Sequence, residues 1–167
     1  MTIELNNIKL SLYDNNNSGH INLLMDLEGE SKSEYIHDIR ARLIEGNLKK
    51  DFPFGVGFVV SFYDKVVGYV FISKRIKDEI FLEYSLSSKY RGKGYGKILL
   101  DEVSFYLMDN YNIKSISLDI DPSNLPSIST ALSVGYVVDD EEYINRGMEG
   151  KILYRMDNYN YINKRKK

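Results

Sequence analysis

The segment that most constrains this chain is RGKGYG, at residues 91–96, which lies between an apolar alternating run and a long amphipathic run. Its glycines leave backbone N–H groups uncovered by side chains where a helix is expected to begin, and the helix dipole is positive there. Arg91, Lys93 and Lys97 add positive charge around the segment. The pattern therefore predicts a strand–turn–helix unit whose turn binds an anion, with a phosphate or diphosphate of a nucleotide-like ligand as the expected occupant.

Ordinary strand-to-helix turns also collect glycines, so the segment has to be compared with known phosphate loops. A Walker loop needs Lys followed by Ser or Thr after its last glycine, whereas Lys97 and Ile98 follow Gly96. The dinucleotide fingerprint has G-x-G-x-x-G spacing after the first strand, whereas this segment has G-x-G-x-G spacing after several expected strands. We therefore expect neither a nucleoside triphosphate site nor a dinucleotide site.

The length and composition predict one globular domain over residues 1–167, because 43% of the residues are apolar and 28% are charged. The basic tail at about 160–167 is expected to be solvated, with docking to an acidic partner as the alternative. A formal net charge of -2 gives no electrostatic reason to expect a nucleic acid or an anionic membrane as partner.

Cysteine is absent, which excludes an acyl-cysteine mechanism and a cysteine metal site. His20 and His37 have no metal-ligand spacing, so no metal is expected, and each is predicted to be a surface or helix-end residue. The opening residues lack a cationic segment before an apolar core, and no apolar run approaches membrane-spanning length. We therefore expect a soluble, cytoplasmic protein with no membrane partner.

Hydrophobic spacing divides the chain into expected strands and helices. Alternation predicts strands at 8–13, 55–63, 66–73, 80–87 and 115–121, and a closing pair within 136–144 and 151–158. Helical spacing predicts helices after the turn at 14–19, with a capping box at Ser31 and Glu34 and an end near Gly46, then at 92–111 and at 125–134. The two runs before and after Asp64 and Lys65 are expected to form an antiparallel hairpin. The whole predicts a single α+β domain with a mixed, mostly antiparallel sheet.

Two motifs resemble the GNAT superfamily of acyl-CoA-dependent N-acetyltransferases. Arg91, Gly94 and Gly96 match its glycine loop, in which Arg or Gln is followed by two residues, Gly, one residue, and Gly or Ala. NLPSISTALSVGY, at 124–136, is similar to a later motif in which Asn begins a short helix that ends in Gly before an aromatic strand residue. Gly68 also fits the third strand usual in the family. The resemblance covers about residues 55–137.

The resemblance implies a three-layer fold with about seven strands, a splayed central pair and about four helices. The spacing is closest to the branch that acetylates protein N-termini, including ribosomal proteins, and that branch also contains enzymes with small-molecule substrates. It implies acetyl-CoA as co-substrate, with its diphosphate on the loop amides, its pantetheine arm along the strand that ends at Leu86, and a nearby N–H stabilising the oxyanion. The expected binding residues are Leu86, Arg91, Gly92, Lys93, Gly94, Tyr95, Gly96, Lys97, Asn124 and Ser127. A simple helix N-cap is the alternative role for Asn124.

The general acid is the point where the sequence departs from the family. Many members have Tyr four residues before the Gly that ends the second motif, and here Ala131 occupies that position. Ser127, one turn earlier on the same face, is the candidate catalytic donor to the thiolate, directly or through a water in the space of the missing ring. Its alternative role is a hydroxyl bonded within the first turn of its own helix. Ser133 lies on a different face and is a poorer candidate.

Glu83 is the candidate catalytic base, because alternation places it with Ser85 on the side of the strand opposite Leu82. An exposed sheet residue is the alternative role. Asp119 and Asp121 are the next candidates, and Tyr136 and Tyr143 are either acceptor-pocket or core residues.

Two functions follow. The first is an N-acetyltransferase whose acceptor, a protein N-terminus or a small-molecule primary amine, attacks acetyl-CoA directly in a ternary complex. The second, motivated by Ala131, is a non-catalytic acyl-CoA-binding regulatory domain. We expect residues 19–46 and 136–150 to determine the specificity for the acceptor. The second range contains an acidic run at 139–142, which either attracts a cationic amine or is simply solvated. For the oligomeric state, the sequence is compatible with a monomer and with a homodimer.

Overall fold

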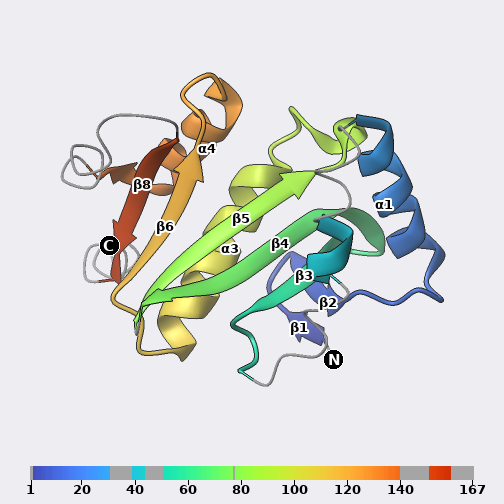
Figure 1. The fold of residues 1–167 in the computed structure, drawn as a ribbon, viewed down its shortest axis with the longest axis horizontal. Helices are drawn as coiled ribbons and strands as arrows, with labels where there is room; N and C mark the ends of the chain where they lie inside the picture. The colour runs from blue at the N-terminus through green and yellow to red at the C-terminus, as the bar shows by residue number, and fades with distance from the viewer. Residues whose placement is uncertain (1, 31–38, 44–50, 77, 140–150, 159–167) are drawn as a thin grey trace. The chain divides into compact units, whose positions relative to one another are not determined.

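The computed structural model describes residues 2–30, 39–43, 51–76, 78–139 and 151–158. They form an α+β fold with an eight-stranded mixed sheet of strand order β1-β2-β3-β4-β5-β6-β8-β7 (Figure 1). The chain consists of two compact units, Met1–Ser73 with Tyr84–Gly96, and Lys74–Glu83 with Lys97–Lys167. The boundary between the units falls within β4, β5 and α3, and each unit is described in turn.

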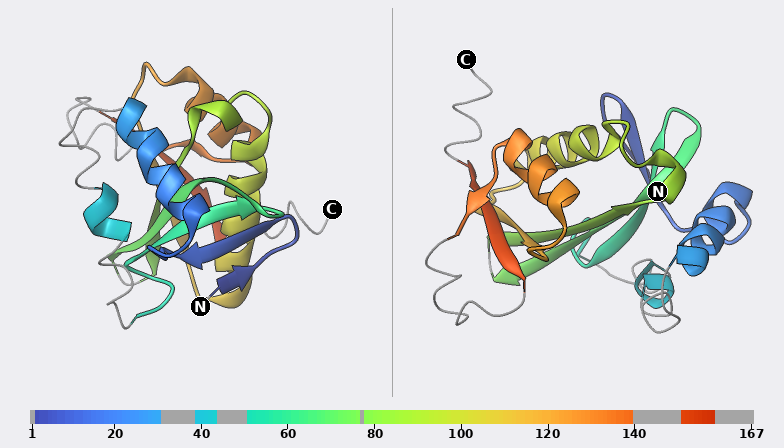
Figure 2. Two further views of the ribbon diagram at one scale, coloured as in Figure 1. Left: turned by 90° about the vertical axis from the view of Figure 1, so that its right-hand side faces the viewer. Right: turned by 90° about the horizontal axis from the view of Figure 1, so that it is seen from above.

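The first unit contains an antiparallel sheet built from β1 (Thr2–Glu4), β2 (Ile8–Leu12), β3 (Val56–Phe62) and the first part of β4 (Lys65–Ile76). Helix α1 (Ser18–Glu30) lies across one face of these strands (Figure 2). Its apolar residues, with Ile39 and Leu43, form a core with the inward side chains of β3 and β4: Leu23, Leu24, Leu27, Val59, Tyr69 and Phe71. All seven residues of β3 are buried, as expected of a strand covered on both faces.

The second unit contains β6 (Ser115–Ile120), β8 (Ile152–Asp157), β7 (Val137–Val138) and the first part of β5 (Glu79–Leu86). The start of β5 is parallel to β6, whereas β6 with β8 and β7 with β8 are antiparallel. Helix α3 (Tyr95–Asn110) buries an apolar stripe at helical spacing: Leu99, Leu100, Val103 and Leu107. Helix α4 (Leu125–Val134) ends at Gly135, whose φ of 117° is the left-handed C-cap conformation that glycine favours.

Most of the expected elements are confirmed, including the hairpin of β3 and β4 and the closing pair β7 and β8. The structure describes eight strands where about seven were expected, because the three residues of β1 are too few to show alternation. Helix α3 begins at Tyr95 rather than at Gly92, after the short 3₁₀ helix η1 (Ser88–Tyr90). The capping box at Ser31 and Glu34 lies outside the described residues.

Helix α1 begins earlier than the sequence predicts, because Asn17 caps it. The Asn17 Oδ1 accepts the N–H groups of Gly19 at 2.9 Å and of His20 at 3.2 Å, so the last two residues of the expected turn at 14–19 already belong to the helix. The prediction of a surface position for His20 is wrong, since its side chain is 4% exposed, although it does lie at a helix end. His37 lies outside the described residues, and none of the described helices is long and apolar enough to cross a bilayer.

Candidate active site

The glycine loop lies between η1 and α3 in the first unit, at the position that the sequence predicts. Gly92 and Gly94 have φ values of 71° and 85°, a region of backbone conformation that glycine occupies without strain. A Cβ atom built on either glycine would meet no other heavy atom within 4 Å. The two glycines are therefore not covered by neighbouring side chains, and their surface is open to a ligand.

The N–H groups of the loop bond to no backbone carbonyl in the part of the chain that the structure describes. Among the described residues, no carbonyl accepts a hydrogen bond from the N–H groups of Gly92–Gly96, whereas the Arg91 N–H donates to the Ser88 carbonyl at 3.2 Å. The last of these groups are also the first N–H groups of α3, which have no acceptor within the helix. With the exposed side chains of Lys93 and Lys97, the loop has the donors and the charge to hold an anion.

The end of β5 is fixed against β4 and against the loop. The Ser87 N–H donates to the Val67 carbonyl at 2.8 Å, and a Cβ on Gly68 would overlap the Ser85 carbonyl oxygen. The Arg91 Nε donates to the Leu86 carbonyl at 3.0 Å, so this arginine positions the strand end as well as adding charge. The close approach of the two strands explains why glycine occurs in the middle of β4.

The Tyr95 ring holds the loop to β3. It packs on Phe62, with ring centroids 4.6 Å apart, and on Tyr90, with centroids 5.9 Å apart. Such tilted and edge-on contacts are the preferred geometries of aromatic pairs. The loop conformation is therefore supported from both ends, by Arg91 and by Tyr95.

The pairing of β5 with β6 is short. Glu79, Ile80 and Phe81 pair with Ser115, Ile116 and Ser117, and the pairing ends there although both strands continue. This early end of the pairing agrees with the splayed central pair that the sequence resemblance implies. The later backbone groups of β5, up to Leu86, are therefore not used in a ladder with β6.

In the second unit, Asn124 is the N-cap of α4. Its Oδ1 accepts the Ser127 N–H at 3.3 Å, which confirms the capping role that was the alternative for this residue. Ser127 is partly buried, and Ala131, one turn later, is completely buried. The Ser133 hydroxyl donates to the Thr130 carbonyl at 2.7 Å on another face of the helix.

Of the carboxylates, Glu83 lies on β5 and is partly buried. Asp119 is exposed on β6, and Asp121 lies in an exposed turn in which its Oδ1 accepts the Ser123 hydroxyl at 2.6 Å and the Ser123 N–H at 2.8 Å. These two hydrogen bonds lower the pKa of Asp121. A carboxylate stabilised in its charged form is a weaker base, so Asp121 is poorly suited to accept a proton.

Two tyrosines near the site are withdrawn from solvent, Tyr136 completely and Tyr84 in part. Tyr136 is 1% exposed and its hydroxyl lies 2.7 Å from the Ser104 hydroxyl, which confirms the core alternative; Tyr143 lies outside the described residues. Tyr84, on β5, is partly buried, and this burial raises the pKa of its phenol to about 12. Tyr84 therefore keeps its proton at neutral pH and is a second candidate proton donor, which the sequence analysis missed.

Comparisons with known proteins agree with this geometry. The model of the acetyltransferase (GNAT) family matches residues 21–136, which include both motifs. No curated protein matches the chain.

Three solved structures with a similar fold are distant from this chain in sequence. An acetyltransferase of the GNAT family from Bacillus anthracis has a TM-score of 0.69 at 15% identity, covering 95% of this chain and 99% of that one. The ribosomal-protein-S5-alanine acetyltransferase from Vibrio fischeri has a TM-score of 0.71 at 21% identity, covering 95% and 97%. The Campylobacter jejuni N-acetyltransferase PseH, solved with acetyl coenzyme A, has a TM-score of 0.65 at 14% identity, covering 90% and 98%. Because the family match extends over more than half of the chain and includes the glycine loop, this protein belongs to the acetyltransferase (GNAT) family and is an acyltransferase.

Proposed function

We propose that the protein transfers an acetyl group from acetyl-CoA to a primary amine, which attacks directly while both substrates are bound. The observation that carries this proposal is the uncovered glycine loop, with open space over Gly92 and Gly94 and N–H groups that meet no carbonyl among the described residues. Its donors fit the diphosphate of coenzyme A, and Arg91, Lys93 and Lys97 add charge-assisted contacts. Acetyl-CoA supplies a thioester with an electrophilic carbonyl carbon and a thiolate leaving group.

The end of β5 is the proposed support of the pantetheine arm. An extended ligand can hydrogen-bond to a strand edge as an added strand would, and β5 no longer pairs with β6 beyond Phe81. An N–H near Leu86 then stabilises the oxyanion of the tetrahedral intermediate. Asn124 uses its Oδ1 for the cap of α4, and its Nδ2 group is the donor that we assign to the arm.

Two side chains are assigned to proton transfer. Glu83 accepts the proton that the amine loses, and the Ser127 hydroxyl donates to the departing sulfur. Such transfers typically accelerate a reaction by ~10² to 10⁴. Positioning of the two substrates contributes at least as much, since well-oriented reactants can lower a barrier by ~7 kcal/mol or more. Proton transfer and substrate positioning can therefore still accelerate the reaction in an enzyme that has Ala131 in place of a tyrosine.

The acceptor is assigned to two classes of amine, protein N-termini and small molecules. The similar structures include a ribosomal-protein acetyltransferase and a microcin C7 self-immunity acetyltransferase, at 21% and 17% identity. The amine is the reacting group in both classes. The assay below determines whether a protein or a small molecule carries it. We place the protein in the cytoplasm, where acetyl-CoA is available.

The test is release of CoA thiol from acetyl-CoA in the presence of peptides with free N-termini, polyamines and aminoglycosides. We expect thiol release that requires an acceptor, with the acceptor gaining one acetyl group by mass spectrometry. Tight CoA binding by calorimetry without thiol release on any acceptor would instead support the alternative, a non-catalytic regulatory domain that binds acyl-CoA.

A further inference from the structure

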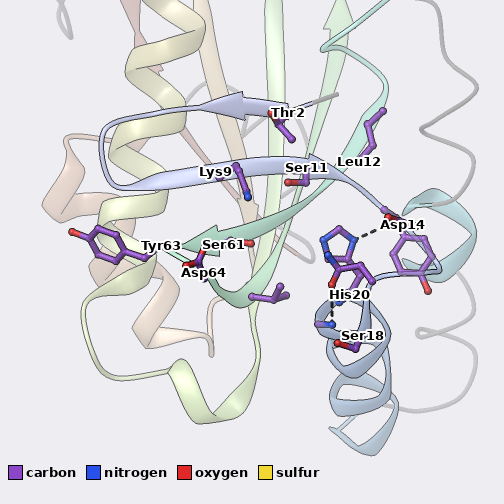
Figure 3. Close-up of a pocket in the computed structure, with 14 residues that line it drawn as sticks. Thr2, Lys9, Ser11, Leu12, Asp14, Ser18, His20, Ser61, Tyr63 and Asp64 are labelled. Atoms are coloured by element: carbon purple, nitrogen blue, oxygen red, sulfur yellow. Dashed lines mark hydrogen bonds between the residues drawn. The ribbon is translucent and has the colours of Figure 1, made fainter.

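A pocket of about 680 Å³ lies in the first unit, between the turn of the β3–β4 hairpin and the start of α1 (Figure 3). Its volume is in the range of ~300–1,000 Å³ that small-molecule sites occupy. Its lining residues are mostly polar and come from β1, β2, α1 and the hairpin: Thr2, Lys9, Ser11, Leu12, Tyr13, Asp14, Asn17, Ser18, Gly19, His20, Ser61, Tyr63, Asp64 and Val66.

The strand register places four polar side chains together, and they form the floor of this pocket. Lys9 pairs directly with Ser61, and Thr2 pairs directly with Ser11, so these four side chains share one face of the sheet. Phe62, the residue after Ser61, points to the other face, where its ring packs on Tyr95 of the glycine loop. The pocket and the loop therefore contact opposite faces of β3 and are separate sites.

Three side chains in the lining are polar and more than nine-tenths buried. Ser11 is 8% exposed, Ser61 is 5% exposed and His20 is 4% exposed, and they are three of the seven buried polar residues in the described part of the chain. Figure 3 shows both serine side chains and the imidazole directed into the same space. Within the described ranges no hydrogen bond joins either serine hydroxyl to another residue, and neither oxygen is one of the fully buried atoms without a partner, so both are available to a ligand in the pocket.

The floor presents hydrogen-bond donors. The His20 Nδ1 accepts the Asp14 N–H at 3.0 Å, so in the neutral imidazole the proton is on Nε2, which points away from that bond. Burial lowers the pKa of His20, which keeps the ring in this neutral form at pH 7. The half-buried Lys9 adds an ammonium group beside the hydroxyls. One positive charge among several donors suits a carboxylate.

The rim of the pocket carries negative charge, opposite to the charge of Lys9 on the floor. Asp14, at the end of β2, and Asp64, in the hairpin turn, are exposed lining residues. Carboxylates at this position suit an ammonium group of the same ligand. We propose that this pocket binds a small zwitterion, with its carboxylate on Lys9, His20 and the two serines and its ammonium group at the aspartates, which is the chemistry of free amino acids and short peptides.

The proposal can be tested by amide NMR titration of the full chain with L-amino acids and dipeptides. Each ligand is compared with the amine that lacks its carboxylate and with the acid that lacks its amine. We expect saturable shifts at the amides of His20, Ser61 and Asp64, and binding at least about tenfold weaker for either half-molecule, because each loses a charged hydrogen-bonded pair. The amino acid and dipeptide arms distinguish the two sources of a zwitterion.

Three variants and one control assign the contacts. Lys9→Met should weaken zwitterion binding about tenfold or more, and Lys9→Arg should restore it. Asp64→Asn should reduce the preference for the zwitterion over the acid without an amine. Lys65→Met removes an exposed charge from the same hairpin outside the lining and should change nothing.

The proposal is overturned if no ligand gives saturable shifts up to about 10 mM. It is also overturned if binding is the same in Lys9→Met, Asp64→Asn and the unaltered protein. Binding is the readout, so either negative result would leave the proposed acetyl transfer untouched.

Discussion

The buried imidazole of His20 links the stability of the first unit to pH. The ring is 4% exposed and its Nδ1 accepts a backbone N–H, so protonation costs both solvation and that hydrogen bond. Burial therefore lowers the folded-state pKa below the ordinary value of 6.5, despite the opposing effect of Asp14. A lowered pKa means that the unfolded chain binds more protons, so the stabilisation is complete above pH 6.5 and is lost as the pH falls through the folded-state pKa.

We predict that His20→Gln reduces this acid sensitivity, because the amide can accept the Asp14 N–H without titrating. Urea unfolding at about pH 7.5 and about pH 5.5 measures the effect as the change in the free energy of unfolding. The unaltered protein should lose more stability on acidification than the variant. An equal loss in both would show that His20 is not responsible.

Ser127 and Ser133 form a matched pair on α4. Ser127 is the proposed donor to the thiolate, whereas the Ser133 hydroxyl donates to the Thr130 carbonyl on another face. Ser127→Ala should lower kcat by ~10² or more with little change in the Kd of CoA, because the hydroxyl acts on the departing sulfur. Ser133→Ala should leave kcat unchanged. If the two variants turn over equally, Ser127 has no role in the chemistry and the partly buried phenol of Tyr84 becomes the candidate donor.

Among the elements, β4 depends most on a single missing side chain. A Cβ on Gly68 would overlap the Ser85 carbonyl oxygen and approach the Leu86 Cα at 3.0 Å, and a backbone neighbour cannot rotate away. Gly68→Ala should lower the free energy of unfolding by about 2 kcal/mol or more. Gly19→Ala is the comparison, because its Cβ would meet the side chain of Val66 at 3.0 Å, which can shift. Equal urea midpoints for the two variants would contradict the close approach of β4 and β5.

Helix α4 and strand β1 show which elements the sequence predicts and which it does not. Asn124 and Gly135 carry local cap signals, and α4 begins and ends where those signals place it. Thr2–Glu4 has too few residues for alternation to appear, although it pairs with the neighbouring strand β2 across a short turn. The residues of the candidate site divide in the same way, into those with a local signal in the sequence and those without one. The loop glycines were predicted from local pattern, whereas the burial of His20 and the partial burial of Tyr84 depend on packing that no local pattern encodes.

For the whole molecule, the account depends on the glycine loop binding the diphosphate of coenzyme A. Gly94→Ala tests this directly, since its Cβ would meet no atom within 4 Å and the main cost is a φ of 85° for a residue that is not glycine. Gly55→Ala is the matched control, because Gly55 also has a positive φ, 73°, but lies just before β3 rather than in the loop.

The decisive measurement is the calorimetric Kd of CoA and of pantetheine, which lacks the diphosphate, for the unaltered protein and both variants. We predict that Gly94→Ala weakens CoA binding by about tenfold, since a strained left-handed residue costs ~1–2 kcal/mol. Pantetheine binding to Gly94→Ala, and both ligands on Gly55→Ala, should be unchanged. CoA affinity that is unaffected by Gly94→Ala, or that falls equally with pantetheine affinity, would contradict the claim that the loop holds the diphosphate.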